Sequence, residues 1–168
     1  MRTIKFKAKN RICEWVKGDL LQYLNGTVYI GENEGPWTDD GFHNSDYTNV
    51  ESVDPDTICQ FTGLLDKNGK EIYEGDVLRS DTYPYSCTEF KERDNYYGAI
   101  YWSCKDAAFK IMCIKNIKSS SDRIMFDGYS YSISKDSSQD FEVIGNVHDI
   151  EWEQYREYIQ DEDEEQHQ

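Results

Sequence analysis

The chain has 168 residues, a net charge of −15 and a 14% share of aromatic residues, with 13 tyrosines. This length allows one large or two small domains, and the aromatic content favours β-strands. The negative charge disfavours binding to a phosphate backbone unless a local basic patch overcomes the repulsion. No apolar run is long enough to span a membrane, and we find no apolar segment typical of a secretory signal.

The charge is unevenly distributed along the chain. Residues 1–17 carry a net +5, residues 18–66 carry ten acidic and no basic side chains, and residues 151–168 carry a net −7. The five cysteines form no C-x-x-C pair. Without a secretory signal, they predict reduced thiols and a cytoplasmic location. The ordinary role of such acidity is solubility.

The N-terminal segment alternates apolar residues at positions 4, 6 and 8 with lysines at positions 5, 7 and 9. This period of two predicts a strand with one buried face. The lysine face is expected to be solvated and to protect a sheet edge, with anion binding as the alternative. Next, Asn25-Gly26 separates two β-rich runs, 20–24 and 27–30, and predicts a hairpin with a type I′ turn.

Residues 31–56 lack periodicity and are rich in Gly, Asn, Asp and Ser, so a long loop is expected there. His43 lies in this loop beside acidic residues and is a candidate ligand for a metal ion, although a single His without further ligand spacing is not a metal motif. Short strand-like runs then follow at near-regular spacing, which predicts a barrel or a sandwich. They are 58–66, 71–80, 96–103, 108–114, 129–135 and 141–147.

The C-terminal segment differs from the rest. The spacing of Ile150, Trp152, Tyr155 and Ile159 predicts one face of a short helix, with Asp149 as its N-cap. The final "DEDEEQHQ" is expected to be a solvated acidic tail. Earlier in the chain, "WVKGDLL" (15–21) is similar to "IYEGDVL" (72–78), so two related β subdomains or a chance likeness both remain open.

The stretch "QFTGLLDKNGKEIYEGDVLR" (60–79) resembles the signature of the YopX family of phage and prophage proteins. The segments "MRTIKFKAK", "CEWVKGDL" and "FEVIGNV" resemble that family too, in the same order, so the likeness spans about residues 1–147. It departs from the usual pattern at Cys59, at Leu65 and in the acidic tail. The resemblance implies a soluble, intracellular, β-rich protein with an SH3-type barrel component, and it implies no catalytic residues.

We interpret the motif at residues 60–79 as mainly structural. Its glycines supply backbone freedom at turns, its Asn and Asp side chains support turns, and its apolar residues are core candidates. The alternative is a recognition patch formed by Lys67, Lys70 and Arg79 around the hairpin. The family-like positions, expected to be structural, are Gln60, Thr62, Gly63, Asp66, Asn68, Gly69, Ile72, Tyr73, Gly75 and Asp76.

We therefore expect a mostly β protein with three segments. These are an N-terminal β subdomain with a long acidic loop (1–60), an SH3-like barrel subdomain (61–148), and a short C-terminal helix with an acidic tail (149–168). No nucleophile elbow, phosphate loop or zinc spacing is found, so we expect no enzyme activity, no cofactor and no metal site.

The expected role is an intracellular interaction or assembly module that binds a protein partner or a second copy of itself. One alternative is an SH3-like protein that binds nucleic acid through the basic N-terminal strand. The other alternative is an acidic mimic of nucleic acid that acts on a host protein.

Overall fold

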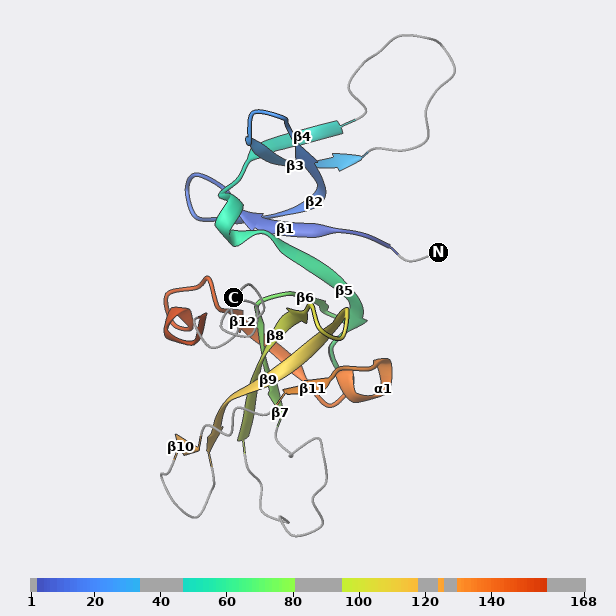
Figure 1. The fold of residues 1–168 in the computed structure, drawn as a ribbon, viewed down its shortest axis with the longest axis vertical. Coiled ribbons are helices and arrows are strands. Elements are labelled where there is room, and N and C mark those ends of the chain that lie inside the picture. Colours follow the sequence, from blue (N-terminus) through green and yellow to red (C-terminus); the bar gives the residue numbers. More distant parts are fainter. Residues whose placement is uncertain (1–2, 34–46, 81–94, 118–123, 126–129, 157–168) are drawn as a thin grey trace. The chain divides into compact units, whose positions relative to one another are not determined.

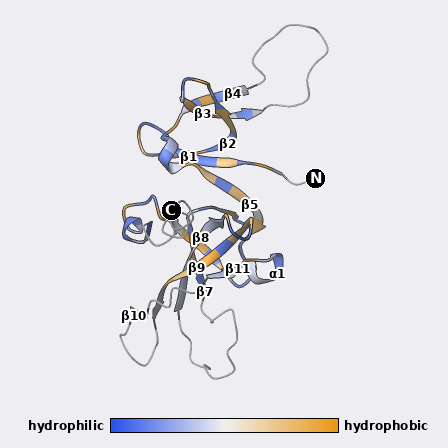
Figure 2. Ribbon diagram, in the orientation of Figure 1, coloured by the Kyte–Doolittle hydropathy of each residue, from blue (hydrophilic) through white to orange (hydrophobic). Residues whose placement is uncertain are grey.

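The computed structural model describes residues 3–33, 47–80, 95–117, 124–125 and 130–156 (Figure 1). These residues are mostly β, as predicted, and the strands form two antiparallel sheets. Figure 2 shows hydrophobic stretches on the strands, whereas the short helix α1 (Lys135–Ser138) is hydrophilic. The chain divides into two compact units, unit 1 (residues 1–61) and unit 2 (residues 62–168).

Unit 1 is built from four strands and the beginning of a fifth. Antiparallel pairing gives the order β4-β3-β2-β1-β5. Its core lies on one face of this sheet, where Ala8, Val28, Ile30 and Val53 are buried. The elements are β1 (Phe6–Lys9), β2 (Trp15–Gln22), β3 (Val28–Asn33), β4 (Tyr47–Ser52), the 3-10 helix η1 (Pro55–Thr57) and β5 (Cys59–Leu65), which continues into unit 2.

The predicted solvated lysine edge on β1 is wrong, because β1 pairs with β2 on one side and with β5 on the other. Lys7 is only 8% exposed, and its ammonium lies 4.6 Å from the centre of the Trp15 ring. Lys9 lies 5.3 Å from the same ring, and Lys5 lies 5.7 Å from the Phe61 ring. These lysines contact aromatic faces, where the ring quadrupole attracts a cation.

The hairpin between β2 and β3 is confirmed, but its turn is not type I′. Gly26 N donates to Tyr23 O at 3.0 Å, and Tyr23 N donates to Thr27 O at 3.0 Å. Gly26 has a φ of 84°, whereas Asn25 is not among the residues with positive φ. These bonds and this φ value define a three-residue hairpin loop, in which a turn is followed by one left-handed residue that forms a bulge. Only that last position, Gly26, needs a glycine.

Unit 2 contains a six-stranded antiparallel sheet, in which five strands follow the order β10-β9-β8-β7-β12 and the sixth, β11, also pairs with β9. Its main core lies over this sheet and contains Ile72, Leu78, Tyr96, Ile100 and Phe141. The strands are β6 (Glu71–Tyr73), β7 (Asp76–Ser80), β8 (Asn95–Ser103), β9 (Ala108–Ile117), β10 (Ile124–Met125), β11 (Ser130–Ser132) and β12 (Glu142–Asn146).

The expected strand at 129–135 is too long, because a helix begins at Lys135. β11 covers Ser130–Ser132, and the capping side chain of Ser134 accepts a hydrogen bond from Ser137 N. Ser137 in turn bonds back to the Ser134 amide, which completes a capping box. This reciprocal pairing satisfies amides that have no partner within the helix. The expected run 71–80 is likewise two strands, β6 and β7, separated by a turn.

The two units share one connectivity. In unit 1, β1 to β4 pair in succession, a short helix follows, and β5 returns antiparallel to β1. In unit 2, β7, β8 and β9 pair in succession, β10 and β11 both pair with β9, α1 follows, and β12 returns antiparallel to β7. Both sheets are open at their ends among the described residues, so a closed SH3-like barrel is not confirmed.

This connectivity does not align the two similar sequence segments. Residues 15–21 lie on β2, the second strand of unit 1, whereas residues 72–78 end on β7, which is the first strand of the unit 2 succession. The likeness of "WVKGDLL" and "IYEGDVL" therefore does not mark equivalent strands. A relation between the two units would have to rest on their shared strand order.

The segment after β12 contains turns and the 3-10 helix η2 (Glu153–Tyr155) rather than a helix that begins at Asp149. Asp149 Oδ2 instead accepts a hydrogen bond from Asn146 N at 3.0 Å. Ile150 is 92% exposed, while Trp152 packs against Tyr97 with ring centres 6.0 Å apart. The remainder of the expected helix and the acidic tail lie outside the described residues.

Candidate functional site

Asp66 is the buried centre of the family motif. Its side chain is 1% exposed, and Oδ1 accepts hydrogen bonds from Asn68 N at 2.8 Å and Lys70 N at 2.9 Å. Oδ2 accepts from Val143 N at 2.9 Å. A buried carboxylate is tolerated only when its oxygens are hydrogen-bonded. Asp66 therefore shapes its own turn and also attaches that turn to β12.

Further contacts hold the same turn against β12. Lys67 N donates to Phe141 O at 3.0 Å, and Lys70 Nζ donates to Val143 O at 3.3 Å. Gly69 takes a φ of 78° and donates its amide to Asp66 O at 2.9 Å. The turn 66–70 is thus a fixed part of unit 2.

Asp76 and Asn146 form a second buried polar centre. Both are 1% exposed, and Asn146 Nδ2 donates to Asp76 Oδ1 at 3.0 Å and to Glu74 O at 3.2 Å. Asp76 Oδ2 accepts from Tyr73 N at 2.8 Å. Asn146 Oδ1 accepts from His148 N at 3.0 Å. The "EGD" and "GNV" segments therefore stabilise each other across the pairing of β7 with β12.

The other polar motif residues also have structural partners. Thr62 Oγ1 donates to Ile72 O at 2.8 Å. The Tyr73 hydroxyl donates to Glu71 Oε2 at 2.8 Å. Burial, followed by this hydrogen bond, raises the pKa of Tyr73 above its ordinary value. Tyr73 therefore stays protonated near neutral pH.

The remaining motif positions serve the backbone and the core. Gln60 is half-buried on β5, opposite Phe6 of β1. Gly63 and Gly75 have φ values of 88° and 72°, and Ile72 is fully buried. These positions contribute to strand pairing, turns and the core, and their use in recognition of a partner stays untested.

The three cationic residues of the expected recognition patch are turned towards β12. Arg79 Nη2 lies 2.9 Å from Glu142 Oε2, and Lys67 Nζ lies 3.4 Å from the same oxygen. Lys70 bonds to the Val143 carbonyl. The hydrogen bond from Arg79, and then that from Lys67, lowers the pKa of Glu142 below its ordinary value. Their use in recognition of a partner stays a prediction.

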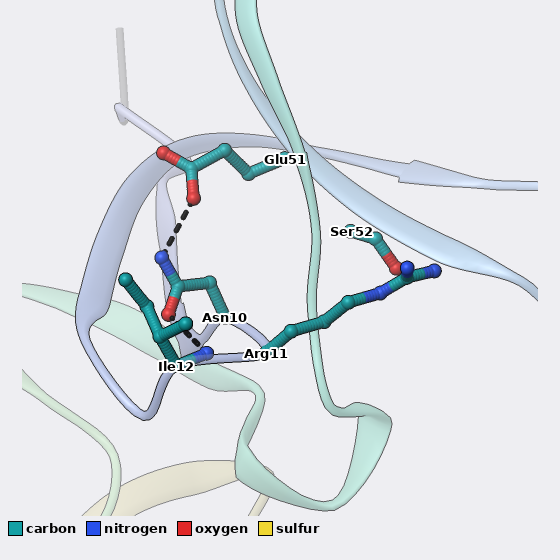
Figure 3. A pocket seen from close by; sticks show the side chains of 5 residues that line it. All are labelled: Asn10, Arg11, Ile12, Glu51 and Ser52. Carbon is teal, nitrogen blue, oxygen red and sulfur yellow. Dashed lines mark hydrogen bonds between the residues drawn. The ribbon is translucent and has the colours of Figure 1, made fainter.

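A separate hollow of about 430 Å³ lies on unit 1, lined by Asn10, Arg11, Ile12, Glu51 and Ser52 (Figure 3). Asn10 Nδ2 donates to Glu51 Oε2 at 2.7 Å. Asn10 Oδ1 accepts from Ile12 N at 3.1 Å and from Glu14 N at 3.0 Å. Asn10 thus fixes the β1–β2 turn and connects it to the end of β4.

Sequence reasoning missed two kinds of functional candidate. Glu142 and Asn146 lie in the "FEVIGNV" segment, but only the pairing of β12 with β7 brings them to the motif. The hollow combines two segments about forty residues apart, and no local pattern marks it. His43 lies outside the described residues, and no group of three His, Cys, Asp or Glu side chains within the described part could hold a metal ion.

A family model, described as YopX protein, matches residues 5–150. The chain belongs to the YopX family. The match extends over both units and includes Asp66, Asp76, Glu142 and Asn146. Membership in this family specifies no biochemical role.

Among solved structures, the chain is similar to the crystal structure of protein EF1440 from Enterococcus faecalis. The two share 19% sequence identity with a TM-score of 0.42, over 88% of this chain and 95% of that one. A comparison with curated proteins found no match. Within the residues that the structure describes, no helix has both the length and the apolar character needed to cross a bilayer.

Proposed function

We propose that this YopX protein is a non-catalytic interaction or assembly module of phage or prophage origin that acts in the host cytoplasm. One observation carries the proposal. Asp66, Asp76 and Asn146, the buried polar residues around the motif, direct their side chains at backbone amides, backbone carbonyls and each other. Side chains engaged in this way build a scaffold, whereas a catalytic group must reach a substrate.

The finer fold proposal is that both units are SH3-like modules. A succession of paired strands, a short helix, and a last strand that returns to the first supports this reading in each unit. Such small β units present open strand edges between short turns, and these edges are suited to binding extended segments of other proteins. The fold would then serve to keep an open strand edge in a fixed conformation for binding.

The first test is the solution mass of the full chain by light scattering, at low and at moderate salt. A discrete oligomer, or a stable complex with an added protein partner, is the expected result. Turnover of a substrate that is lost in Asp66→Asn without loss of folding would contradict the proposal, because the scaffold role assigns Asp66 no chemistry.

Binding to nucleic acid is the alternative function, and the basic strand β1 motivates it. A short DNA duplex added to the light-scattering sample tests this alternative, since it predicts a gain of mass at low salt that disappears as salt rises. The third possibility, an acidic mimic of nucleic acid, predicts that the protein displaces DNA from a basic host protein. No displacement at equal concentrations would remove it.

A further inference from the structure

The unit 2 sheet has a second apolar face, opposite its main core. Val77 is fully buried, although it directly precedes Leu78 of the main core. Because side chains alternate between the two faces of a strand, Val77 points to the opposite face. A second cluster lies there, and the C-terminal segment 149–156 packs against it through Trp152 and Tyr155.

The position of Trp152 depends on Gly145 of β12. A Cβ atom at Gly145 would lie 2.5 Å from Nε1 and 2.7 Å from Cδ1 of the indole. Gly145 is not among the glycines with a positive φ, so its backbone conformation does not require a glycine. The missing side chain instead makes room for the ring, which is therefore held in place before any ligand arrives. A preorganised group loses less conformational entropy on binding.

Three aromatic rings follow one another on this face, and we call them the aromatic row. The ring centre of Trp152 lies 6.0 Å from that of Tyr97 on β8 and 6.0 Å from that of Tyr155, with interplanar angles of 32° and 38°. All three side chains are half-buried, so part of each is accessible to a ligand. Trp and Tyr in such positions are the residues that contribute most to binding at protein interfaces.

Negative charge accompanies the aromatic row. Glu151 and Glu153 flank Trp152 in the sequence, and both are exposed. Residues 151–168 carry a net charge of −7, with Arg156 as their single Arg or Lys. The segment that carries two of the three rings is therefore strongly acidic.

A cation on the sheet beside the row is already balanced. Arg79 of β7 lies opposite Tyr97 in the strand register. Its guanidinium is 2.9 Å from the carboxylate of Glu142, so the two charges offset each other. The charge of Arg79 therefore does not cancel that of the acidic segment.

We propose that the aromatic row binds a basic segment of a protein partner, with an arginine guanidinium stacked on Trp152 or Tyr155 and its charge balanced by the neighbouring glutamates. This inference rests on the proposed role as an interaction module, and it names the chemistry of the partner. A guanidinium suits this surface because it is planar and stacks on aromatic faces while it donates to carboxylates. Ile150 is 92% exposed and offers an apolar contact for the aliphatic part of the arginine.

The charges favour such a partner over a nucleic acid or a second copy. The glutamates and the net charge of −15 would repel a chain of phosphates. The basic part of a second copy is residues 1–17, and there Lys7 and Lys9 already lie over the Trp15 ring. A basic segment of another protein gains from both the rings and the carboxylates of the acidic segment.

The test uses the full chain, labelled with ¹⁵N, and two synthetic peptides of glycine and serine. One peptide carries two arginines, and the other carries two citrullines in their place, which keep the planar group and lose the charge. We expect the arginine peptide to shift the indole N–H signal of Trp152, which is assigned by its loss in Trp152→Phe. We also expect it to bind about tenfold more tightly than the citrulline peptide.

Two variants separate the rings from the charges. Tyr155→Leu keeps an apolar side chain, removes one ring and should weaken binding of the arginine peptide about fivefold. Glu151→Gln with Glu153→Gln should reduce the preference for arginine over citrulline about fivefold, and the exposure of both side chains should leave the fold intact. Asp136→Asn with Asp140→Asn makes the same change of charge at exposed positions elsewhere on unit 2. This matched control should change nothing.

Several outcomes would overturn the inference. They are an unshifted Trp152 indole signal with the arginine peptide, equal binding of both peptides, and an equal loss of binding in the Glu151 and Glu153 variant and in its control. A shift of the Trp152 signal by a single-stranded oligonucleotide, or by raised protein concentration alone, would assign the row to another ligand. If an oligomer or a partner complex survives Tyr155→Leu and the double glutamate variant, the proposed function stands and this site does not.

Discussion

The two Asn-Gly turns have the same backbone and different surroundings. In unit 1, Tyr23 N donates to Thr27 O and Gly26 N donates to Tyr23 O; in unit 2, Asp66 and Gly69 make the same pair of bonds in the turn 66–70. Tyr23 is 57% exposed, whereas Asp66 is 1% exposed. The Asn-Gly pair therefore determines the local backbone geometry. The first residue of the turn, Tyr23 or Asp66, determines whether the turn is also bonded to a distant strand of its unit.

The largest expected effect on stability comes from replacing Asp66, the first residue of the unit 2 turn. Asp66→Ala leaves the amides of Asn68, Lys70 and Val143 without their acceptor, and we expect a loss of about 3 kcal/mol in the free energy of unfolding. Urea denaturation followed by the fluorescence of the tryptophans measures it. Hydrogen exchange at Val143 should accelerate as well.

Two controls make this comparison specific. Tyr23→Ala is the matching change in unit 1, and it should cost less than about 1 kcal/mol, since it removes one edge contact with the Tyr29 ring. Asp66→Asn keeps one acceptor oxygen and should fall between the two. Equal losses for Asp66→Ala and Tyr23→Ala would show that the attachment to β12 adds no stability.

The second prediction concerns the glycines, for which the two turns should behave alike. Gly26 and Gly69 have φ values of 84° and 78°, and an added Cβ would meet no atom within 4 Å at either position. Gly26→Ala and Gly69→Ala should therefore each cost about 1 kcal/mol, which is the strain of an L-residue in the left-handed region. A difference above roughly 1 kcal/mol would mean that the surroundings also constrain the glycine.

The third prediction is that the stability contributed by the ion pairs at the unit 2 turn depends on pH, whereas the unit 1 turn should show no such dependence. Arg79 and Lys67 lower the pKa of Glu142 in the folded protein below the ordinary 4.5. The unfolded state then binds more protons, so this stabilisation is complete above pH 4.5 and decreases as the pH falls through the lowered value. Glu142→Gln should be less stable than the natural protein at neutral pH and equal to it at the acidic end.

Urea denaturation at a series of pH values measures this difference. Because Glu142 and its partners are partly exposed, the effect should be small and should decrease further at high salt. A stability difference that stays constant across the acidic range would exclude the ion pairs as its cause.

The smallest expected effect comes from the second position of the turns, where unit 1 has Leu24 and unit 2 has Lys67. Leu24 is fully exposed, so Leu24→Lys should change the free energy of unfolding by less than about 0.5 kcal/mol. Thermal denaturation measures the change. A loss above 1 kcal/mol would indicate that Leu24 is covered in solution.

The sequence predicted the features that depend on near neighbours. The period of two, the Asn-Gly turns and the family motif located most strands, because these signals act within a few residues. The predicted type I′ turn in unit 1 was wrong, because this loop requires a positive φ only at Gly26 and not at Asn25. The missed helix α1 has only a brief signal, the Ser134 and Ser137 capping pair.

The sequence could not predict the features that depend on distant strands. The lysines of β1 seemed to lie on an edge, but β5, about fifty residues later, pairs with that side of the strand. Asp66 seemed to be an ordinary turn residue, although its second oxygen accepts from Val143, 77 residues away. The hollow on unit 1 is lined by residues from two distant segments, and Asn10 bonds there to Glu51, 41 residues away.

The return of β12 to β7 has a consequence for synthesis on the ribosome. Unit 1 has all its strand partners once β5 has emerged, whereas β7 pairs with β12 across more than sixty residues. Until β12 emerges, the Asp66 carboxylate cannot reach Val143, and closure of this long loop costs entropy. We therefore expect unit 1 to fold during translation, and a nascent chain that ends before Phe141 to remain sensitive to protease throughout residues 62–140.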